Sequence, residues 1–164
     1  MSLTIRSLSD SGISTELYVK QLAKWHHEQW LYLNPGASLA ERLSRYQQAV
    51  QSQTLPHLYI ATNETELLGS VTLDKDDMDT RDYLTPWLAS LYVKQEARQQ
   101  GVGSQLIEFC CVQAKQLGYR NLYLFTEDQT QFYRQRGFRL LESVEYRQVE
   151  VDLMCRNLNK QETK

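Results

Sequence analysis

The sequence predicts an α/β (α+β) fold: one domain built on a mixed, mostly antiparallel sheet of about six or seven strands, flanked by about four helices. Three observations favour it. A chain of 164 residues suits one domain with a self-sufficient core. Short apolar segments with the two-residue period of strands occur between longer segments with a helical period. The most continuous apolar segment, Trp87 to Val93, precedes a glycine-spaced turn and a helical segment.

The first third of the chain predicts one strand and two helices. Residues Leu3 to Leu8 alternate in polarity, as a strand does, and a helix is expected to follow as far as about Leu31. Ser38 and Glu41 have the spacing of a capping box, which indicates the start of a second helix. We expect the apolar stripe of this second helix to contain Leu39, Leu43, Tyr46 and Val50.

The middle of the chain predicts a hairpin, a central strand and a helix. His57 to Thr62 and Leu67 to Leu73 flank a short polar connection, which is typical of an antiparallel hairpin. Trp87 to Val93 should lie centrally because it is the most continuous apolar strand. The next helix is expected from Gly103 to about Leu117, and Gly118 is suited to cap its C-terminus.

The last third should complete the sheet. Asn121 to Phe125 is expected to pair in parallel beside the central strand, and a short helix should cover roughly Gln129 to Gln135. Phe138 to Ser143 and Tyr146 to Met154 are expected to close the sheet as a final antiparallel pair.

Composition and charge restrict the possible partners and location. The formal net charge of −2 gives no electrostatic reason to expect nucleic acid or an anionic membrane as a partner. The chain shows no signal-peptide pattern, no apolar run of the ~20 residues that cross a bilayer, and no cysteine spacing of a disulfide framework or zinc site. We therefore expect a cytoplasmic protein without a metal, its domain spanning residues 1–158 and a polar tail spanning 159–164.

The turn after the central strand has the chemistry of an anion site. Gly101 and Gly103 leave backbone N–H groups uncovered, the helix dipole adds positive potential, and Arg98 adds a fixed charge. A diphosphate is the natural ligand. The pattern is neither a dinucleotide-binding Gly-x-Gly-x-x-Gly nor a nucleotide phosphate loop ending in Lys-Ser/Thr. On its own, this pattern also fits ordinary turn glycines.

A second motif, Phe-Tyr-Arg-Gln-Arg-Gly-Phe, occupies residues 132–138. Together with Gly69, the strand that ends at Val93 and the segment from Arg98 to Ser104, it resembles the GNAT superfamily of acyl-CoA-dependent N-acyltransferases. The resemblance implies a GNAT-like fold whose central parallel strands splay apart. It also implies that the cofactor is acetyl-CoA or a related acyl-CoA.

The resemblance implies a set of cofactor contacts. Backbone groups of Leu91, Tyr92 and Val93 would bond the pantetheine arm as an added strand. Thr126 stands where the family often has an asparagine that contacts the cofactor arm, and its hydroxyl can replace part of that contact. The pyrophosphate would be held by the N–H groups of Arg98, Gln99, Gln100, Gly101, Val102, Gly103 and Ser104.

Tyr133 is the candidate general acid, because the resemblance would place the thioester beside it. A phenol of pKa ~10 can donate a proton to a departing thiolate whose thiol has a pKa of ~8.5. The alternative is that Tyr133 only packs with Phe132 and Phe138 in the core.

The general base is left open by the sequence. Several relatives carry a glutamate on the central strand, but Trp87 to Val93 contains no carboxylate. The base is therefore a water chain or a side chain from elsewhere, such as Glu127, His26 or His27.

The acceptor is expected to be a small amine. Acidic residues crowd the loop before Trp87, and Asp76 and Asp77 would attract a cation, with Trp87 and Tyr92 adding apolar or cation–π contact. The alternative is that the acidic loop is simply a solvated polar loop without a binding role. The function expected is N-acetylation of a small-molecule primary amine by direct attack in a ternary complex. Acetylation of a protein terminus or lysine, and a non-enzymatic CoA-binding sensor, stay as alternatives, and a homodimer is left open.

Overall fold

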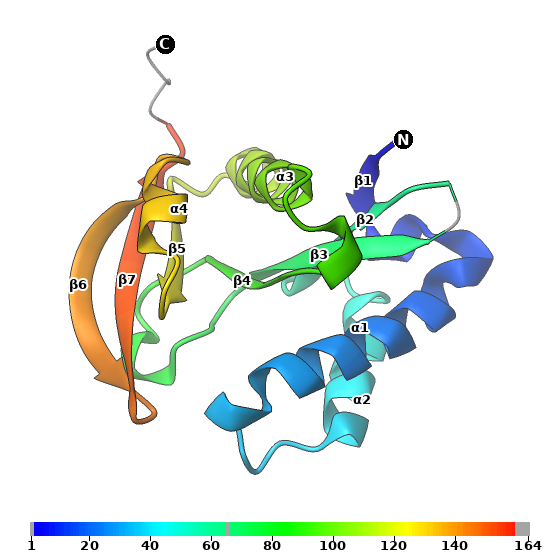
Figure 1. The fold of residues 1–164 in the computed structure, drawn as a ribbon, viewed down its shortest axis with the longest axis horizontal. Helices are drawn as coiled ribbons and strands as arrows, with labels where there is room; N and C mark the ends of the chain where they lie inside the picture. Colours follow the sequence, from blue (N-terminus) through cyan, green and yellow to red (C-terminus); the bar gives the residue numbers. More distant parts are fainter. Residues whose placement is uncertain (1, 65, 160–164) are drawn as a thin grey trace.

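The computed structural model describes residues 2–64 and 66–159, which form a sheet with helices on both faces (Figure 1). The strand order is β1-β2-β3-β4-β5-β7-β6, and β4 and β5 are the parallel neighbours among otherwise antiparallel ones. The strands are β1 (Thr4–Ser7), β2 (His57–Thr62), β3 (Leu67–Asp74), β4 (Trp87–Val93), β5 (Asn121–Thr126), β6 (Arg139–Tyr146) and β7 (Val149–Asn157). The helices are α1 (Thr15–Trp30), α2 (Leu39–Ala49), α3 (Val102–Gln116) and α4 (Thr130–Arg134).

The predicted fold class is confirmed: the described residues form a mixed, mostly antiparallel sheet with four α-helices. The expected hairpin is β2 and β3, and β4 is the central strand of the seven. The expected final pair is β6 and β7, with β7 inserted between β5 and β6. Residues 160–164 of the expected tail lie outside the described residues.

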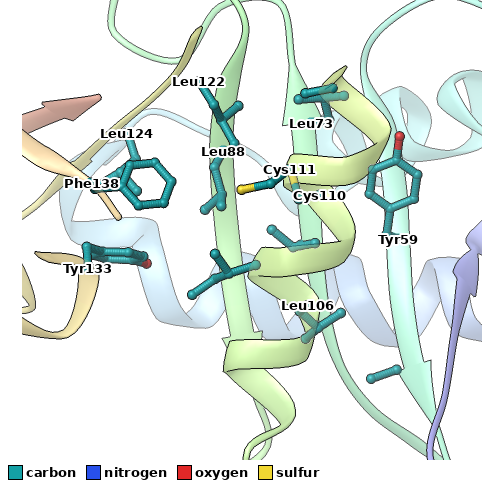
Figure 2. Packing of buried hydrophobic residues seen from close by; sticks show 14 of the residues in the cluster. Tyr59, Leu73, Leu88, Leu106, Cys110, Cys111, Leu122, Leu124, Tyr133 and Phe138 are labelled. Atoms are coloured by element: carbon teal, nitrogen blue, oxygen red, sulfur yellow. The ribbon is translucent and has the colours of Figure 1, made fainter. Parts of the chain in front are cut away.

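The face of the sheet under α3 is apolar (Figure 2). Leu106, Ile107 and Cys110 of α3 are fully buried against Val71 and Leu73 of β3. The same cluster continues through the β4 and β5 side chains to the C-terminal motif. This face supplies most of the hydrophobic core that fixes β4 in the sheet.

The opposite face is covered by α1 and α2 (Figure 1). Leu22 of α1 and Ile60 of β2 are fully buried there. The capping interaction at the start of α2 is confirmed, since the Glu41 N–H donates to Ser38 Oγ at 3.0 Å. The predicted stripe of α2 is wrong at Leu39, which is exposed.

The buried face of α2 instead contains Arg42, Tyr46 and Ala49. The charged side chain of Arg42 points inward, where it bonds Tyr46. Tyr46 is in turn held by a hydrogen bond to His26 of α1. The face toward α1 and α2 is therefore partly polar inside the fold.

Candidate active site

A wedge opens between the two parallel strands of the sheet. β4 and β5 pair at Trp87 and Tyr123, and the Tyr123 N–H donates to Pro86 O at 3.1 Å. Farther along β4 the register with β3 jumps between Ala89 and Tyr92, which marks a β-bulge, and Ser90 has a left-handed φ of 53°. No residue of β4 beyond Trp87 pairs with β5, and both strands lie wholly within the described residues. The expected splay is confirmed.

A cavity of about 620 Å³ lies along this wedge. Ser90 and Leu91 of β4 line it on one side, and Leu124 and Thr126 of β5 line it on the other. Tyr133 of α4 also lines it. Its volume lies in the range of small-molecule sites, so a ligand can reach the unpaired part of β4.

The turn before α3 has an open helix N-terminus. Gly101 is the N-cap with φ 83°, no side chain of a described residue caps the helix there, and Gln99 is also left-handed with φ 63°. Arg98 is fixed beside the turn, because its Nε donates to Val93 O at 2.8 Å. A Cβ on Gly103 would meet only ordinary contacts, 3.8 Å from Val93 Cγ2 being the shortest. The turn thus presents backbone N–H groups with a cation beside them.

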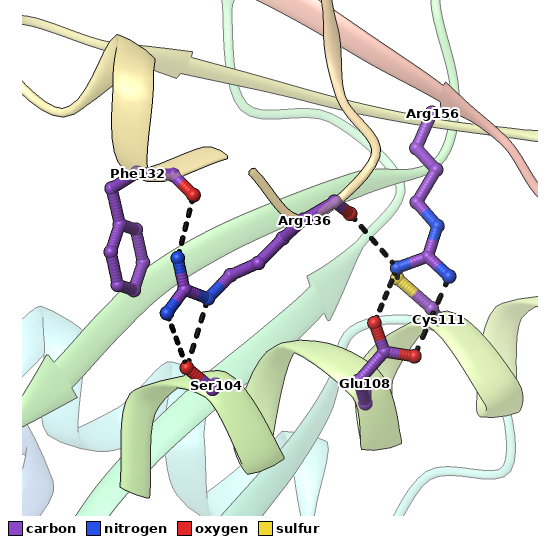
Figure 3. Close-up of polar contacts among 6 residues, drawn as sticks. All are labelled: Ser104, Glu108, Cys111, Phe132, Arg136 and Arg156. Carbon is purple, nitrogen blue, oxygen red and sulfur yellow. Dashed lines mark hydrogen bonds and ion pairs between the residues drawn. The ribbon is translucent and has the colours of Figure 1, made fainter. Parts of the chain in front are cut away.

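A second cation that the sequence reasoning missed lies at the same helix start. Arg136 donates from Nε and Nη2 to Ser104 Oγ at 2.9 and 2.6 Å, and from Nη1 to Phe132 O at 2.7 Å (Figure 3). Its guanidinium carbon lies 3.6 Å from the centroid of the Phe132 ring. Arg156 donates to Arg136 O and pairs with Glu108, which holds this segment on α3. Arg136 belongs to the motif at residues 132–138, and its place in that motif is the sequence feature that could have indicated a cofactor contact.

Tyr133 belongs both to the core and to the cavity. Its ring packs edge-on against Phe138, with ring centroids 5.8 Å apart (Figure 2). It also packs edge-on against Phe132, at 5.3 Å, and is 8% exposed. Burial raises the pKa of Tyr133 to about 12, against the opposing effect of Arg136. The phenol therefore keeps its proton at neutral pH. Packing in the core and lining the cavity are compatible roles for this side chain.

Thr126 also lines the cavity, but its hydroxyl is already engaged. Thr126 Oγ1 accepts the Gln129 N–H at 3.0 Å at the start of α4. The O–H group is left as the part that can donate to a ligand.

The acidic side chains gather at the cavity as a group. Asp77 is half-buried, and burial together with the charge of Asp74 raises the pKa of Asp77 to about 7, while Arg147 opposes the rise. Burial also raises the pKa of Asp74. The carboxylates that line the cavity are Asp74, Asp76, Asp77, Asp79, Glu127 and Asp128.

The two aromatic residues expected near the acceptor lie elsewhere. Trp87 is fully buried, and its Nε1–H donates to Leu84 O at 2.7 Å, so its indole faces the core between the sheet and the acidic loop. Tyr92 stacks on Trp25 of α1 with ring centroids 5.2 Å apart. Neither is among the residues that line the cavity. The prediction of an acceptor contact by Trp87 is not supported by its position.

The family model for the acetyltransferase (GNAT) domain matches residues 55–140, which is more than half of the chain. The matched segment contains the wedge, the glycine turn and Tyr133. The chain belongs to the GNAT acetyltransferase family. No match was found among the curated proteins.

Solved structures share the fold of this GNAT domain at low sequence identity. An aminoglycoside 6'-N-acetyltransferase complexed with coenzyme A is 11% identical, with a TM-score of 0.73 over 98% of this chain and 99% of that one. An N-acetyltransferase from Staphylococcus aureus Mu50 is 17% identical, with a TM-score of 0.72 over 97% and 100%. An N-acetylglutamate synthase from Neisseria gonorrhoeae, complexed with coenzyme A and N-acetyl-glutamate, is 18% identical, with a TM-score of 0.67 over 98% and 36%. At these identities the likeness establishes the fold alone.

The candidate bases of this GNAT domain differ in their access to the cavity. His26 is fully buried, with Nδ1 2.7 Å from Tyr46 Oη and Nε2 2.8 Å from Ser70 Oγ. Burial, with a smaller contribution from Arg42, lowers the pKa of His26 to about 3. His26 and His27 do not line the cavity, whereas Glu127 does. The structure therefore favours Glu127 over the two histidines as a group that a ligand can reach.

Two sets of polar contacts (bridges) join distant segments of the GNAT domain at the rim of the cavity, where Tyr32, Asn34, Asp79, Glu127 and Arg147 lie. Tyr32, after α1, donates its O–H to Glu127 Oε2 at 2.5 Å. Arg147, in the turn between β6 and β7, donates to Asn34 Oδ1 and pairs with Asp79 at 3.0 Å. Each bridge joins a segment near α1 or the acidic loop to the C-terminal half. The rim is therefore closed at these points.

Within residues 2–64 and 66–159, no group of three or more His, Cys, Asp or Glu side chains could hold a metal ion. Among the same residues, no helix has both the length and the apolar character needed to span a bilayer.

Proposed function

We propose that this protein transfers an acetyl group from acetyl-CoA to the primary amine of a small molecule, by direct attack in a ternary complex. The observation that carries the proposal is the wedge between β4 and β5. It joins the open helix N-terminus at one end to the acid-lined cavity at the other, with Tyr133 at the cavity. Such a path suits a long ligand with an anionic end and a reactive end.

The cofactor would be held mainly by backbone groups. Leu91, Tyr92 and Val93 follow the bulge of β4 and have no partner on β5, so they can bond the pantetheine arm as a strand would. The N–H groups from Arg98 to Ser104 would hold the pyrophosphate at the start of α3. We add Arg136 to this set, because its guanidinium is fixed at Ser104.

The chemistry needs one proton removed and one supplied. The bound cofactor supplies a thioester carbonyl for the amine to attack; the C–N bond forms as the C–S bond breaks. Tyr133, which is protonated at neutral pH, donates its phenolic proton to the leaving sulfur and regains a proton from water. An acceptor that enters as an ammonium first loses one proton to solvent and attacks as the neutral amine. The proton that the transfer then removes from its nitrogen leaves through water, with Glu127 as the reachable carboxylate. No covalent enzyme intermediate is required.

The acceptor is best matched by a small amine. The carboxylates that line the cavity attract a cation. The bridges from Tyr32 and Arg147 restrict the rim, which favours a small molecule over a peptide chain. A protein terminus or lysine would need a more open groove.

The proposal is tested by a thiol-release screen with acetyl-CoA against amines, amino acids, aminoglycosides and peptides. We expect release with small amines and little with peptides. Preference for peptides would replace the small acceptor by a protein one. CoA binding without thiol release against the whole panel would instead favour the non-enzymatic sensor.

The cofactor seat is tested separately by Gly103→Val. Because a Cβ at Gly103 has only ordinary contacts, the variant should fold, while its branched side chain occupies the pyrophosphate seat. Calorimetric titration should show loss of CoA binding. Gly36→Val is the matched control, since Gly36 lies in an exposed loop with no atom within 4 Å of its Cβ position. Retained CoA affinity in a folded Gly103→Val protein would contradict the assigned seat.

A further inference from the structure

The acid-lined cavity also contains a buried cation that has no ion-pair partner among the described residues. Arg42 of α2 lines the cavity and is only 7% exposed. Its Nη1 donates to Tyr46 Oη at 3.1 Å, but its Nε is buried with no hydrogen-bond partner. No carboxylate of a described residue forms an ion pair with it. A buried charge without a counter-charge is costly, so a missing anionic partner is the simplest explanation.

A second unsatisfied polar group at this cavity lies on β3. Thr72 of β3 lines the same cavity, is 5% exposed, and its Oγ1 is buried without a partner among the described residues. Threonine hydroxyls can donate to an oxygen anion as readily as to water. Native proteins leave few buried polar atoms unpaired, so two such atoms at one cavity indicate a ligand.

The surrounding contacts hold Arg42 in place. Tyr46 also lines the cavity, and its hydroxyl bonds both Arg42 and His26. Because a guanidinium only donates, the Tyr46 oxygen accepts from Arg42 and can donate its own proton to His26 Nδ1. His26 Nε2 then bonds Ser70 of β3. This chain of hydrogen bonds anchors Nη1 of the guanidinium to the sheet.

We infer that Arg42 and Thr72 bind a carboxylate of the acceptor, which is therefore a small amino acid or another amine that carries a carboxylate. This inference rests on the proposed function and narrows its acceptor class. An arginine fork matches a carboxylate geometrically, and burial strengthens such a pair. The aspartates in the lining take the ammonium group. A diamine would bring a second cation into the cavity and no anion, so the charge of Arg42 would stay uncompensated.

A structural role for Arg42 makes a different prediction. If Arg42 only orients Tyr46, its removal affects every acceptor equally. If it binds a carboxylate, its removal affects only acceptors that have one.

The test compares acceptors that differ only in the carboxylate. Amino acids and their primary amides are assayed in pairs by thiol release with acetyl-CoA, together with 1,4-diaminobutane. We expect the best acid to exceed its amide about tenfold or more in kcat/KM. Arg42→Met should bring the acid down to the level of its amide and leave the amide nearly unchanged. Arg45→Met is the matched control: Arg45 lies on the same helix and lines the same cavity but is exposed, and its loss should not alter the acid-to-amide ratio.

A second variant covers the case in which Arg42→Met does not fold. Thr72→Val removes an unpaired hydroxyl at nearly constant volume, so the protein should be as stable as the wild type or more so. It should still reduce the acid-to-amide ratio by about threefold or more. Amides or the diamine matching the acids, or either folded variant lowering acid and amide by one factor, would overturn the carboxylate site.

Failure of the proposed function gives a distinct result. If no amine releases thiol, the transferase proposal fails, and the carboxylate site is judged by calorimetric titration of the acids and amides into CoA-saturated protein. Tighter binding of the acids that is lost in Thr72→Val supports the site. Equal binding of acid and amide overturns it.

Discussion

The two faces of the sheet differ in what they bury, and β3 shows the difference within a single strand. Val71 and Leu73 point into the apolar cluster under α3. The alternating residues Ser70, Thr72 and Asp74 belong to the other face, where they meet polar groups of α1 and α2 or the cavity. Over residues 70–74 the strand therefore has one side that is apolar and one side that is polar although largely buried.

This difference separates stability from function. Apolar side chains at the α3 face stabilise the fold in proportion to the area they remove from water. Buried polar groups on the other face cost free energy wherever a partner is missing, as at Thr72 and Arg42. A protein keeps such groups where a ligand completes them. Removal of an apolar side chain under α3 and removal of an unpaired polar group on the other face should therefore have opposite effects on the free energy of unfolding.

The largest effect on stability is expected from Leu106→Ala. Leu106 is fully buried in the α3 cluster, and its truncation should lower the free energy of unfolding by about 3 kcal/mol. Urea unfolding followed by circular dichroism measures the change. Thr72→Val on the other face is the matched comparison and should cost nothing or stabilise. Equal losses in the two variants would mean that the faces do not differ in the way described.

The next effect, on turnover, is expected from Tyr133→Phe. Tyr133 extends the apolar cluster to the cavity, so the substitution keeps the packing ring and removes only the phenolic proton donor. We expect kcat to fall ~10²-fold or more with CoA affinity unchanged. Phe138→Leu, which alters the packing beside Tyr133 but removes no proton donor, is the control. An unchanged rate in Tyr133→Phe would assign this residue to the core alone.

Much of the fold could be predicted from local patterns. The strands His57–Thr62 and Trp87–Val93 begin and end where alternation and apolar runs place them, and the Ser38 cap forms as its spacing indicates. These features depend on neighbours within a few residues, which sequence patterns report directly. The glycine turn is likewise local, since Gly101 takes the left-handed conformation that its position suggests.

The parts that could not be predicted depend on distant partners. Arg42 lies inward because Tyr46 bonds His26 from another helix, and hydrophobic periodicity instead favoured Leu39. Trp87 faces the core because the acidic loop folds back on it, which composition cannot reveal. One signal was nevertheless present: Thr72 and its polar neighbours alternate with apolar residues on a strand expected to be interior.

The smallest effect is expected from Asp77→Asn, and it tests the polar face through its pH dependence. The pKa of Asp77 is raised to about 7, whereas an unfolded chain releases this proton near ~3.9. Between these values the native state binds more protons, so this residue makes the free energy of unfolding fall as the pH rises. The variant lacks that titration. Relative to the wild type, its stability should not be changed by this titration near pH 4 and should increase by pH 8. The two pKa values set an upper limit of about 4 kcal/mol on that increase, and solvent around the half-buried carboxyl reduces it to about 1–2 kcal/mol.

Urea unfolding at several pH values measures this gain, and Asp82→Asn is the control. Asp82 is an exposed carboxylate of the same acidic loop, outside the cavity lining, so its substitution shows what removal of an exposed carboxylate does to stability in the same measurement. A pH-independent difference for Asp77→Asn would mean that Asp77 is solvated like Asp82. Asp77 would then lose its distinction from a surface carboxylate, and the buried polar character of this face would be limited to the residues around Arg42 and Thr72. A gain that rises between pH 4 and pH 8 would extend that character to the acidic end of the cavity.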